Sequence, residues 1–154
     1  MIASSMILRK VMEMQNPAKA YLSRYQHLML KCEAMERSIS YLREQAESIT
    51  IAMDPNKVQS SPKVHDPIAE AVASIADTQE RLVAARAEAY KALEEITQTI
   101  LRVDSDLLQS LLLMRYVDGM RWEAIAKKIG YEERQTYRLH GVALNKVKQV
   151  IDCQ

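Results

Sequence analysis

Apolar residues recur at alternating steps of three and four along two long segments of the chain, and this spacing predicts helices with one apolar seam each. The first segment starts at Asn16-Pro17, a pair typical of a helix start because Asn caps free amides and proline suits the first turn. We predict a helix from Pro17 to Thr50. Its seam consists of Ala18, Tyr21, Tyr25, Leu28, Cys32, Met35, Ile39, Leu42, Ala46 and Ile49. The same register continues back to Ile7, so we expect a further short helix within the first 15 residues.

The second seam follows a break. The stretch from Met53 to Pro67 has three prolines, two serines and no helical period, so we predict a linker over residues 53–66. Asp66-Pro67 then repeats the start signal. The seam consists of Ile68, Ala71, Ile75, Thr78, Leu82, Ala85, Ala89, Ala92, Ile96, Thr99 and Val103. Two such helices predict a long antiparallel, coiled-coil-like hairpin, closed within one chain or exchanged between two. Because a hairpin alone buries little apolar surface, we expect a homodimer or higher homo-oligomer through these helices.

The last third of the chain predicts three shorter helices. Asp104 or Ser105 can cap the first of them, which ends at Asp118-Gly119. The second is "WEAIAKKIG", and the third follows Gly130, which suits a left-handed turn. The expected inner residues of these last two helices are Trp122, Ile125, Ala126, Ile129, Tyr131, Thr136, Leu139, Val142, Ala143, Val147 and Val150. This spacing indicates a helix-turn-helix, and the alternative is a plain helical hairpin with a glycine turn.

The outward residues at the start of the last helix have the chemistry for binding DNA. Arginine can bond bidentately to guanine and glutamine to adenine, whereas lysines position a protein on phosphates. We interpret Glu132 as a partner of the helix dipole. The candidate DNA-binding residues are Glu133, Arg134, Gln135, Tyr137, Arg138, Arg121, Lys127, Lys128, His140 and Lys146. The alternative for each basic residue is that it lies on an ordinary solvated helix face. We expect His140 to contact the DNA backbone or to lie on the protein surface.

The composition favours helices and does not by itself indicate that the protein binds nucleic acid. The 154 residues include only three glycines, four prolines and no phenylalanine, which favours an all-α fold. The net charge is +1, but residues 115–151 hold eight basic and four acidic side chains. The positive charge is therefore concentrated in the C-terminal part.

Candidate catalytic or metal-binding groups are scattered. His27, His65 and His140 lie far apart, and Cys32 and Cys153 have no metal-binding spacing. No phosphate-binding glycine loop is present in the sequence. We therefore expect a binding protein with no cofactor and no catalytic activity. The apolar start of the chain is too short for a signal peptide and too charged for a membrane span, so we expect a cytoplasmic protein without membrane contact.

The segment "LLLMRYVDGMRWEAIAKKIGYEERQTYRLHGVALNKV" resembles region four of the sigma factors, which reads an upstream promoter element. It resembles still more closely the phage-encoded sigma-region-four-like proteins, including the ArpU-type late transcription regulators. The matching motifs are Arg115-Tyr116, Asp118-Gly119, Trp122, Ala124-Ile125-Ala126 and the run from Gly130 to Leu144. The long helical first half, with "SIT" at residues 48–50 and Ser61-Pro62, is also similar, so the resemblance covers nearly the whole chain.

The resemblance implies that Arg134, Gln135 and Arg138 occupy the base-reading positions of a recognition helix, flanked by Glu133 and Tyr137. The chain departs from the family where Arg121 and Glu132 replace the usual Ser or Thr caps, and where Thr136 replaces Ile or Val. Losing a cap costs about 1 kcal/mol. These departures affect local stability rather than the exposed surface.

We therefore expect two domains: a helical hairpin and oligomerisation region over residues 1–103, and a helix-turn-helix domain over residues 104–154. The expected function is sequence-specific binding of double-stranded DNA to regulate transcription, in phage or prophage late genes. One alternative is a phage DNA-packaging protein similar to a small terminase subunit. Another is an adaptor that binds RNA polymerase without recognising DNA.

Overall fold

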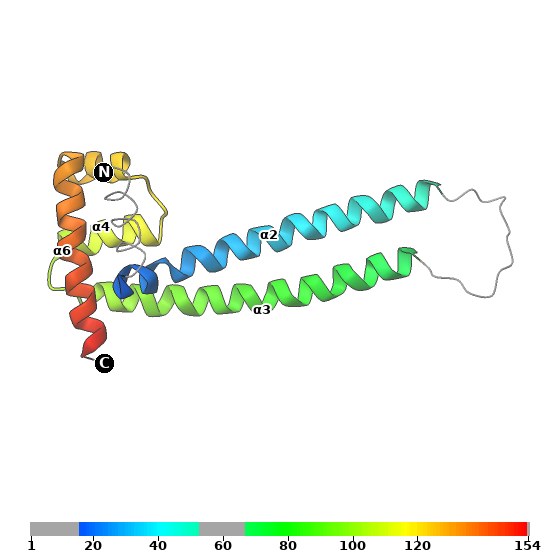
Figure 1. Cartoon of the computed structure of the whole chain (residues 1–154), viewed down its shortest axis with the longest axis horizontal. Helices are drawn as coiled ribbons and strands as arrows, with labels where there is room; N and C mark the ends of the chain where they lie inside the picture. Colours follow the sequence, from blue (N-terminus) through cyan, green and yellow to red (C-terminus); the bar gives the residue numbers. More distant parts are fainter. Residues whose placement is uncertain (1–15, 53–66, 154) are drawn as a thin grey trace, which may run out of the picture. The chain divides into compact units, whose positions relative to one another are not determined.

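The computed structural model describes residues 16–52 and 67–153, and these residues form an all-α fold with five helices and no strand. The helices are α2 (Pro17–Ala52), α3 (Pro67–Leu101), α4 (Asp106–Tyr116), α5 (Trp122–Ile129) and α6 (Glu133–Asp152), as shown in Figure 1. The predicted all-α class is confirmed. The predicted helix within residues 1–15 and the predicted linker over residues 53–66 lie outside the described residues. In the described ranges, no helix has both the length and the apolar character needed to cross a membrane.

The chain packs as two compact units, which are described separately. The terminal unit contains the described residues 16–27 and 89–153, and the middle unit contains the described residues 28–52 and 67–88. The start of α2 and the end of α3 therefore pack in the same unit as α4, α5 and α6. The predicted domain division after residue 103 stays a prediction.

A thin apolar core holds the middle unit together. Its buried residues come from the predicted seams of α2 and α3, and they are Cys32, Ile39, Leu82 and Ala85, with Met35 and Ile75 packed against them. Arg86 of α3 also forms an ion pair with Glu36 of α2. A core of this size leaves most of the surface of both helices exposed.

The terminal unit has the larger core and more polar links. The side chain of Asn16 accepts a hydrogen bond from the Ala18 amide at 3.1 Å, which caps α2. Tyr21 and Thr99 share a hydrogen bond of 3.1 Å between their hydroxyls, and Arg24 pairs with Glu95. The largest fully buried aliphatic side chains of this unit are Leu22, Ile96, Ile100, Leu111, Leu112, Ile125 and Val147. This core supports α5 and α6 from one side.

Candidate nucleic-acid interface

A tight turn at Gly130 joins α5 to α6. Gly130 has φ +75° and ψ 29°, in the left-handed region that favours glycine, and its amide donates to the carbonyl of Ala126. The amide of Tyr131 donates to the same carbonyl at 3.0 Å. These two bonds satisfy the end of α5 and allow α6 to start at Glu133.

Because of this geometry, we predict opposite effects for two glycine-to-alanine substitutions. Gly130→Ala places a side chain in a left-handed backbone and is expected to destabilise the fold by about 1–2 kcal/mol. Gly141 lies inside α6 with open space around it, so Gly141→Ala is expected to stabilise the fold by about 0.5–1 kcal/mol. Urea unfolding of both variants checks this pair, and equal effects would contradict the left-handed turn.

The inner faces of α5 and α6 are buried against each other and against α4. The three helices contact one another pairwise. Thr136 is 0% exposed, and its hydroxyl donates to the carbonyl of Glu132 at 3.1 Å, so a threonine is accommodated where the resemblance leads one to expect Ile or Val. The prediction is wrong for two residues that were expected in the core, because Tyr131 is 43% exposed and Val142 is 49% exposed.

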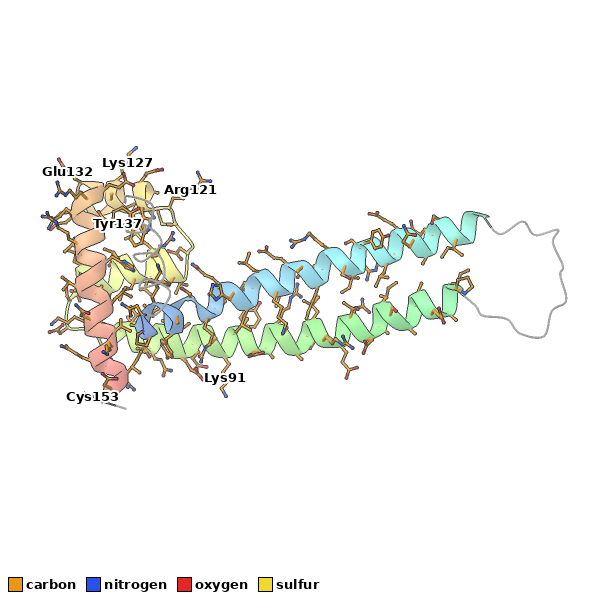
Figure 2. The ribbon with its side chains drawn as sticks, in the orientation of Figure 1. Lys91, Arg121, Lys127, Glu132, Tyr137 and Cys153 are labelled. Atoms are coloured by element: carbon orange, nitrogen blue, oxygen red, sulfur yellow. The ribbon has the colours of Figure 1, made fainter. Side chains whose placement is uncertain are left out.

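The outer side of the α5–α6 turn carries most of the candidate DNA-binding residues. Those that are exposed are Glu133, Arg134, Gln135, Tyr137, Arg138, Arg121, Lys127 and Lys128. Figure 2 shows Arg121, Lys127, Glu132 and Tyr137 at the end of the terminal unit where α5 meets α6, with Cys153 at the far end of α6. We call these eight exposed residues, which stand around the α5–α6 turn, the α5–α6 tip.

The cations of the α5–α6 tip have no competing partner in the described part of the chain. The ion pairs found there involve Arg24, Arg81, Arg86 and Lys146, and none involves a basic residue of the tip. The side chains of Arg121 and Glu132 make no capping hydrogen bond. Guanidinium and ammonium groups in this condition are available to phosphates and base edges.

Lys146 differs from the other candidates. Its ammonium nitrogen lies 2.9 Å from a carboxylate oxygen of Asp104, and the hydrogen bond and charge of Lys146 lower the pKa of that carboxyl. Lys146 stands three turns of α6 beyond Thr136. A phosphate that reaches Lys146 has to compete with Asp104.

An aromatic cluster, which the sequence did not reveal, lies beneath the α5–α6 tip. The ring centroid of Trp122 is 4.9 Å from that of Tyr137 and 4.7 Å from that of His140. The guanidinium of Arg115 lies 4.8 Å from the Trp122 ring and donates to the carbonyl of Met120 at 2.9 Å. Trp122 therefore connects α4, α5 and α6, and it holds Tyr137 at the edge of the exposed surface.

His140 is a buried member of this cluster, so its expected place at the surface is wrong. Its side chain faces inward one turn after Thr136, and its Nε2 lies 2.8 Å from the hydroxyl of Tyr116. Burial, with smaller contributions from the charges of Lys19 and Arg115, lowers the pKa of His140 to about 4. His140 is thus neutral at pH 7 and supports α6 from inside.

The lowered pKa predicts a pH-dependent stability. In the unfolded chain the pKa of His140 is 6.5, so between pH 6.5 and about 4 the unfolded state binds more protons than the folded state. The free energy of unfolding is therefore highest above pH 6.5, and it decreases by roughly 1–3 kcal/mol as the pH falls towards 4. Urea unfolding at pH 7 and pH 5 should show this loss for the natural chain and a smaller loss for His140→Gln. Equal losses would show that His140 does not titrate in this way.

The described residues contain no group of three or more His, Cys, Asp or Glu side chains that could hold a metal ion. The α5–α6 tip combines exposed cations, an amide and a phenol next to the turn at Gly130. Comparisons of the chain with protein-family models, with curated proteins and with solved structures find no match.

Proposed function

We propose that the chain is a sequence-specific DNA-binding regulator of transcription that acts on phage or prophage late genes. The observation that carries this proposal is the α5–α6 tip. Its Arg134, Gln135 and Arg138 are exposed on the first two turns of α6, directly after the left-handed turn at Gly130. We interpret α5, the turn and α6 as a helix-turn-helix similar to sigma region four, with α6 in the major groove.

Each part of the tip has a distinct role in this proposal. Arg134 and Arg138 pair with guanine, and Gln135 pairs with adenine. Lys127, Lys128 and Arg121 contact phosphates, and Tyr137 reaches the edge of the groove from its position on Trp122. Glu133 lies in the first turn of α6, where its charge favours the helix dipole and where it can accept from a cytosine amino group. An acidic start of this kind predicts modest affinity per subunit.

In the same proposal, α2 and α3 form an antiparallel hairpin that joins two or more copies of the chain. Two contacts within the terminal unit support the antiparallel direction, because Tyr21 meets Thr99 and Arg24 meets Glu95. As the residue numbers rise along α2, the residue numbers of the contacting partners on α3 fall. Joining two tips raises the affinity for paired half-sites above that of either tip alone.

The proposal is tested by measuring the affinity of the full chain for a duplex enriched from a random pool and for a scrambled duplex, across a salt series. The enriched duplex should bind roughly 10³-fold more tightly, and both affinities should fall with salt. Equal affinity for both duplexes would contradict sequence-specific binding. Capture of RNA polymerase with no DNA affinity would favour the adaptor, and a ring of eight or so subunits would favour DNA packaging.

A further inference from the structure

After its first residue, α6 carries several basic side chains and no acidic one until its last residue, Asp152. Two arginines and two lysines stand between these ends. Lys146 is held by Asp104, whereas Lys148 is exposed and has no ion pair in the described part of the chain. Positive charge without nearby acidic side chains attracts anionic partners. The exposed side of α6 therefore favours an anion along most of its length.

Five exposed residues of α6 form a stripe on the side turned away from the core. They recur at steps of four and three, which keeps them on one side of the helix. They are Arg134, Arg138, Gly141, Asn145 and Lys148, and we call them the α6 stripe. The residues two positions after the first four of them are the buried Thr136, His140, Ala143 and Val147. Because two residues turn a helix by about 200°, the α6 stripe faces away from the core.

Gly141 stands in the middle of the α6 stripe, where the fold does not require a glycine. A Cβ atom at this position would meet no other atom within 4 Å. Glycine inside a helix is less favourable than alanine, so this residue lowers the stability of the free chain. The absence of a side chain lets another molecule approach the helix backbone closely. Gly141 is thus explained better by a bound partner than by packing within the chain.

We propose that the second half of the α6 stripe binds the sugar–phosphate backbone of duplex DNA, which passes closest to the helix at Gly141 and places a phosphate beside Lys148. This inference rests on the proposed function, in which Arg134 and Arg138 enter the major groove. A recognition helix enters by its N-terminal residues, and the groove is about 12 Å wide. From Arg134 to Lys148 the stripe is about 21 Å long. Its second half therefore reaches the backbone at the edge of the groove.

Lys148, rather than the predicted Lys146, has the position for a phosphate contact. Lys146 precedes it by two residues, so the two lysines point to different sides of α6. The ammonium nitrogen of Lys146 lies 2.9 Å from a carboxylate oxygen of Asp104, whereas Lys148 continues the line of Arg134 and Arg138. An acidic protein surface would attract the same charges, but this line starts at the residues that are proposed to bind bases. The continuity favours DNA as the partner.

Removal of one cation from the stripe tests the phosphate contact. Lys148→Ala should weaken binding to the enriched and the scrambled duplex by the same factor, about fivefold to tenfold at about 0.1 M salt, because a phosphate contact is independent of sequence. The slope of log affinity against log salt should become shallower by about 0.9. The matched control is Lys91→Ala, which removes the same charge from an exposed site on α3 and should leave the slope unchanged (Figure 2). Equal effects of the two variants would overturn the proposal.

Side chains added at Gly141 test the close approach. Gly141→Leu should weaken binding to both duplexes by about tenfold or more, because its side chain would also move the phosphate away from Lys148. Gly141→Ala should weaken binding by a smaller factor while its midpoint of urea unfolding rises, so unfolding cannot explain its loss of affinity. Unchanged affinity of Gly141→Leu would contradict the close approach. If Gly141→Leu loses helix content by circular dichroism, the affinity of Gly141→Ala decides.

An added cation gives a test by gain of affinity. Asn145→Lys should strengthen binding to both duplexes about fivefold, whereas Gln98→Lys, which adds the same charge on exposed α3, should have little effect. The ratio of the two affinities separates this proposal from the proposed function. A ratio near one for the natural chain would contradict sequence-specific recognition, and a loss with Lys148→Ala on either duplex would still support the backbone contact. A large ratio with unchanged affinity of Lys148→Ala and Gly141→Leu would overturn the backbone contact alone.

Discussion

Replacing both Arg134 and Arg138 by alanine is expected to weaken binding to a specific DNA site by roughly a hundredfold or more, while the melting temperature stays unchanged. Each bidentate contact to guanine contributes about 1–3 kcal/mol of discrimination. Both side chains are exposed and form no ion pair in the described residues, so their loss removes nothing from the folded chain itself. Fluorescence anisotropy with a labelled duplex measures the affinity, and thermal melting measures the stability.

The matched control removes two arginines of equal charge elsewhere. Arg43 on α2 and Arg102 after α3 are also exposed, and Arg43→Ala with Arg102→Ala gives the same net charge as the test variant. The control should reduce affinity only slightly, through weaker long-range attraction that disappears at higher salt. If both double variants lose the same affinity, the α5–α6 tip has no special role and binding depends on net charge.

The largest effect on stability is expected from Leu112→Ala in α4. Leu112 is 0% exposed and belongs to the core that supports α5 and α6. Truncating a buried leucine loses transfer energy and leaves a cavity, which together cost about 2–5 kcal/mol. Urea unfolding at pH 7 measures the loss. DNA binding should fall only under conditions where the variant begins to unfold, since Leu112 does not reach the surface.

Leu101→Ala is the comparison for this substitution. Leu101 ends α3 and is 55% exposed, so the same chemical change should alter the free energy of unfolding by less than about 0.5 kcal/mol. Similar losses for both leucines would mean that α4 is not packed in the core of the terminal unit. A large loss confined to Leu112 confirms that α4 is the helix on which the α5–α6 tip rests.

The helices of the first two thirds could be predicted closely, because a seam at steps of three and four has one simple solution. The predicted starts at Pro17 and Pro67 are confirmed, and Ser105 is the residue that caps α4. Leu22 and Ile100 are also fully buried although they lie outside the predicted seams. Both belong to the terminal unit, where α2 and α3 pack with further helices, and a two-helix pattern cannot reveal those extra contacts.

The errors at the candidate site came from assigning Val142 and Tyr131 to the core because they are apolar, and His140 to the surface because it is polar. Val142 was expected inside because it is apolar, yet the buried stripe of α6 passes through Thr136, His140, Ala143 and Val147, which recur at steps of three and four. That spacing was present in the sequence and would have placed His140 inside. Tyr131 was expected in the core for the same reason as Val142, and it is exposed in the turn.

The aromatic cluster could not be predicted, because its members come from separate helices whose crossing angles the sequence does not encode in any simple pattern. Trp122, Tyr137 and His140 meet only once α5 and α6 are placed. The same holds for Gln26, whose side chain donates to the carbonyl of Arg115 at 2.8 Å and thereby links α2 to the end of α4. Contacts of this kind depend on tertiary geometry rather than on local periodicity.

The central claim is that the first turns of α6 recognise base pairs, and the most direct test is the base preference of Arg138→Ala. Competition binding to every single-base-pair variant of an enriched site gives the preference at each position for the natural chain and for the variant. We predict that the Arg138→Ala variant loses the base preference at one base pair of the site and retains it at the others, as expected when a base contact is removed. A uniform loss of affinity at all positions would identify Arg138 as a phosphate contact and would contradict the claim.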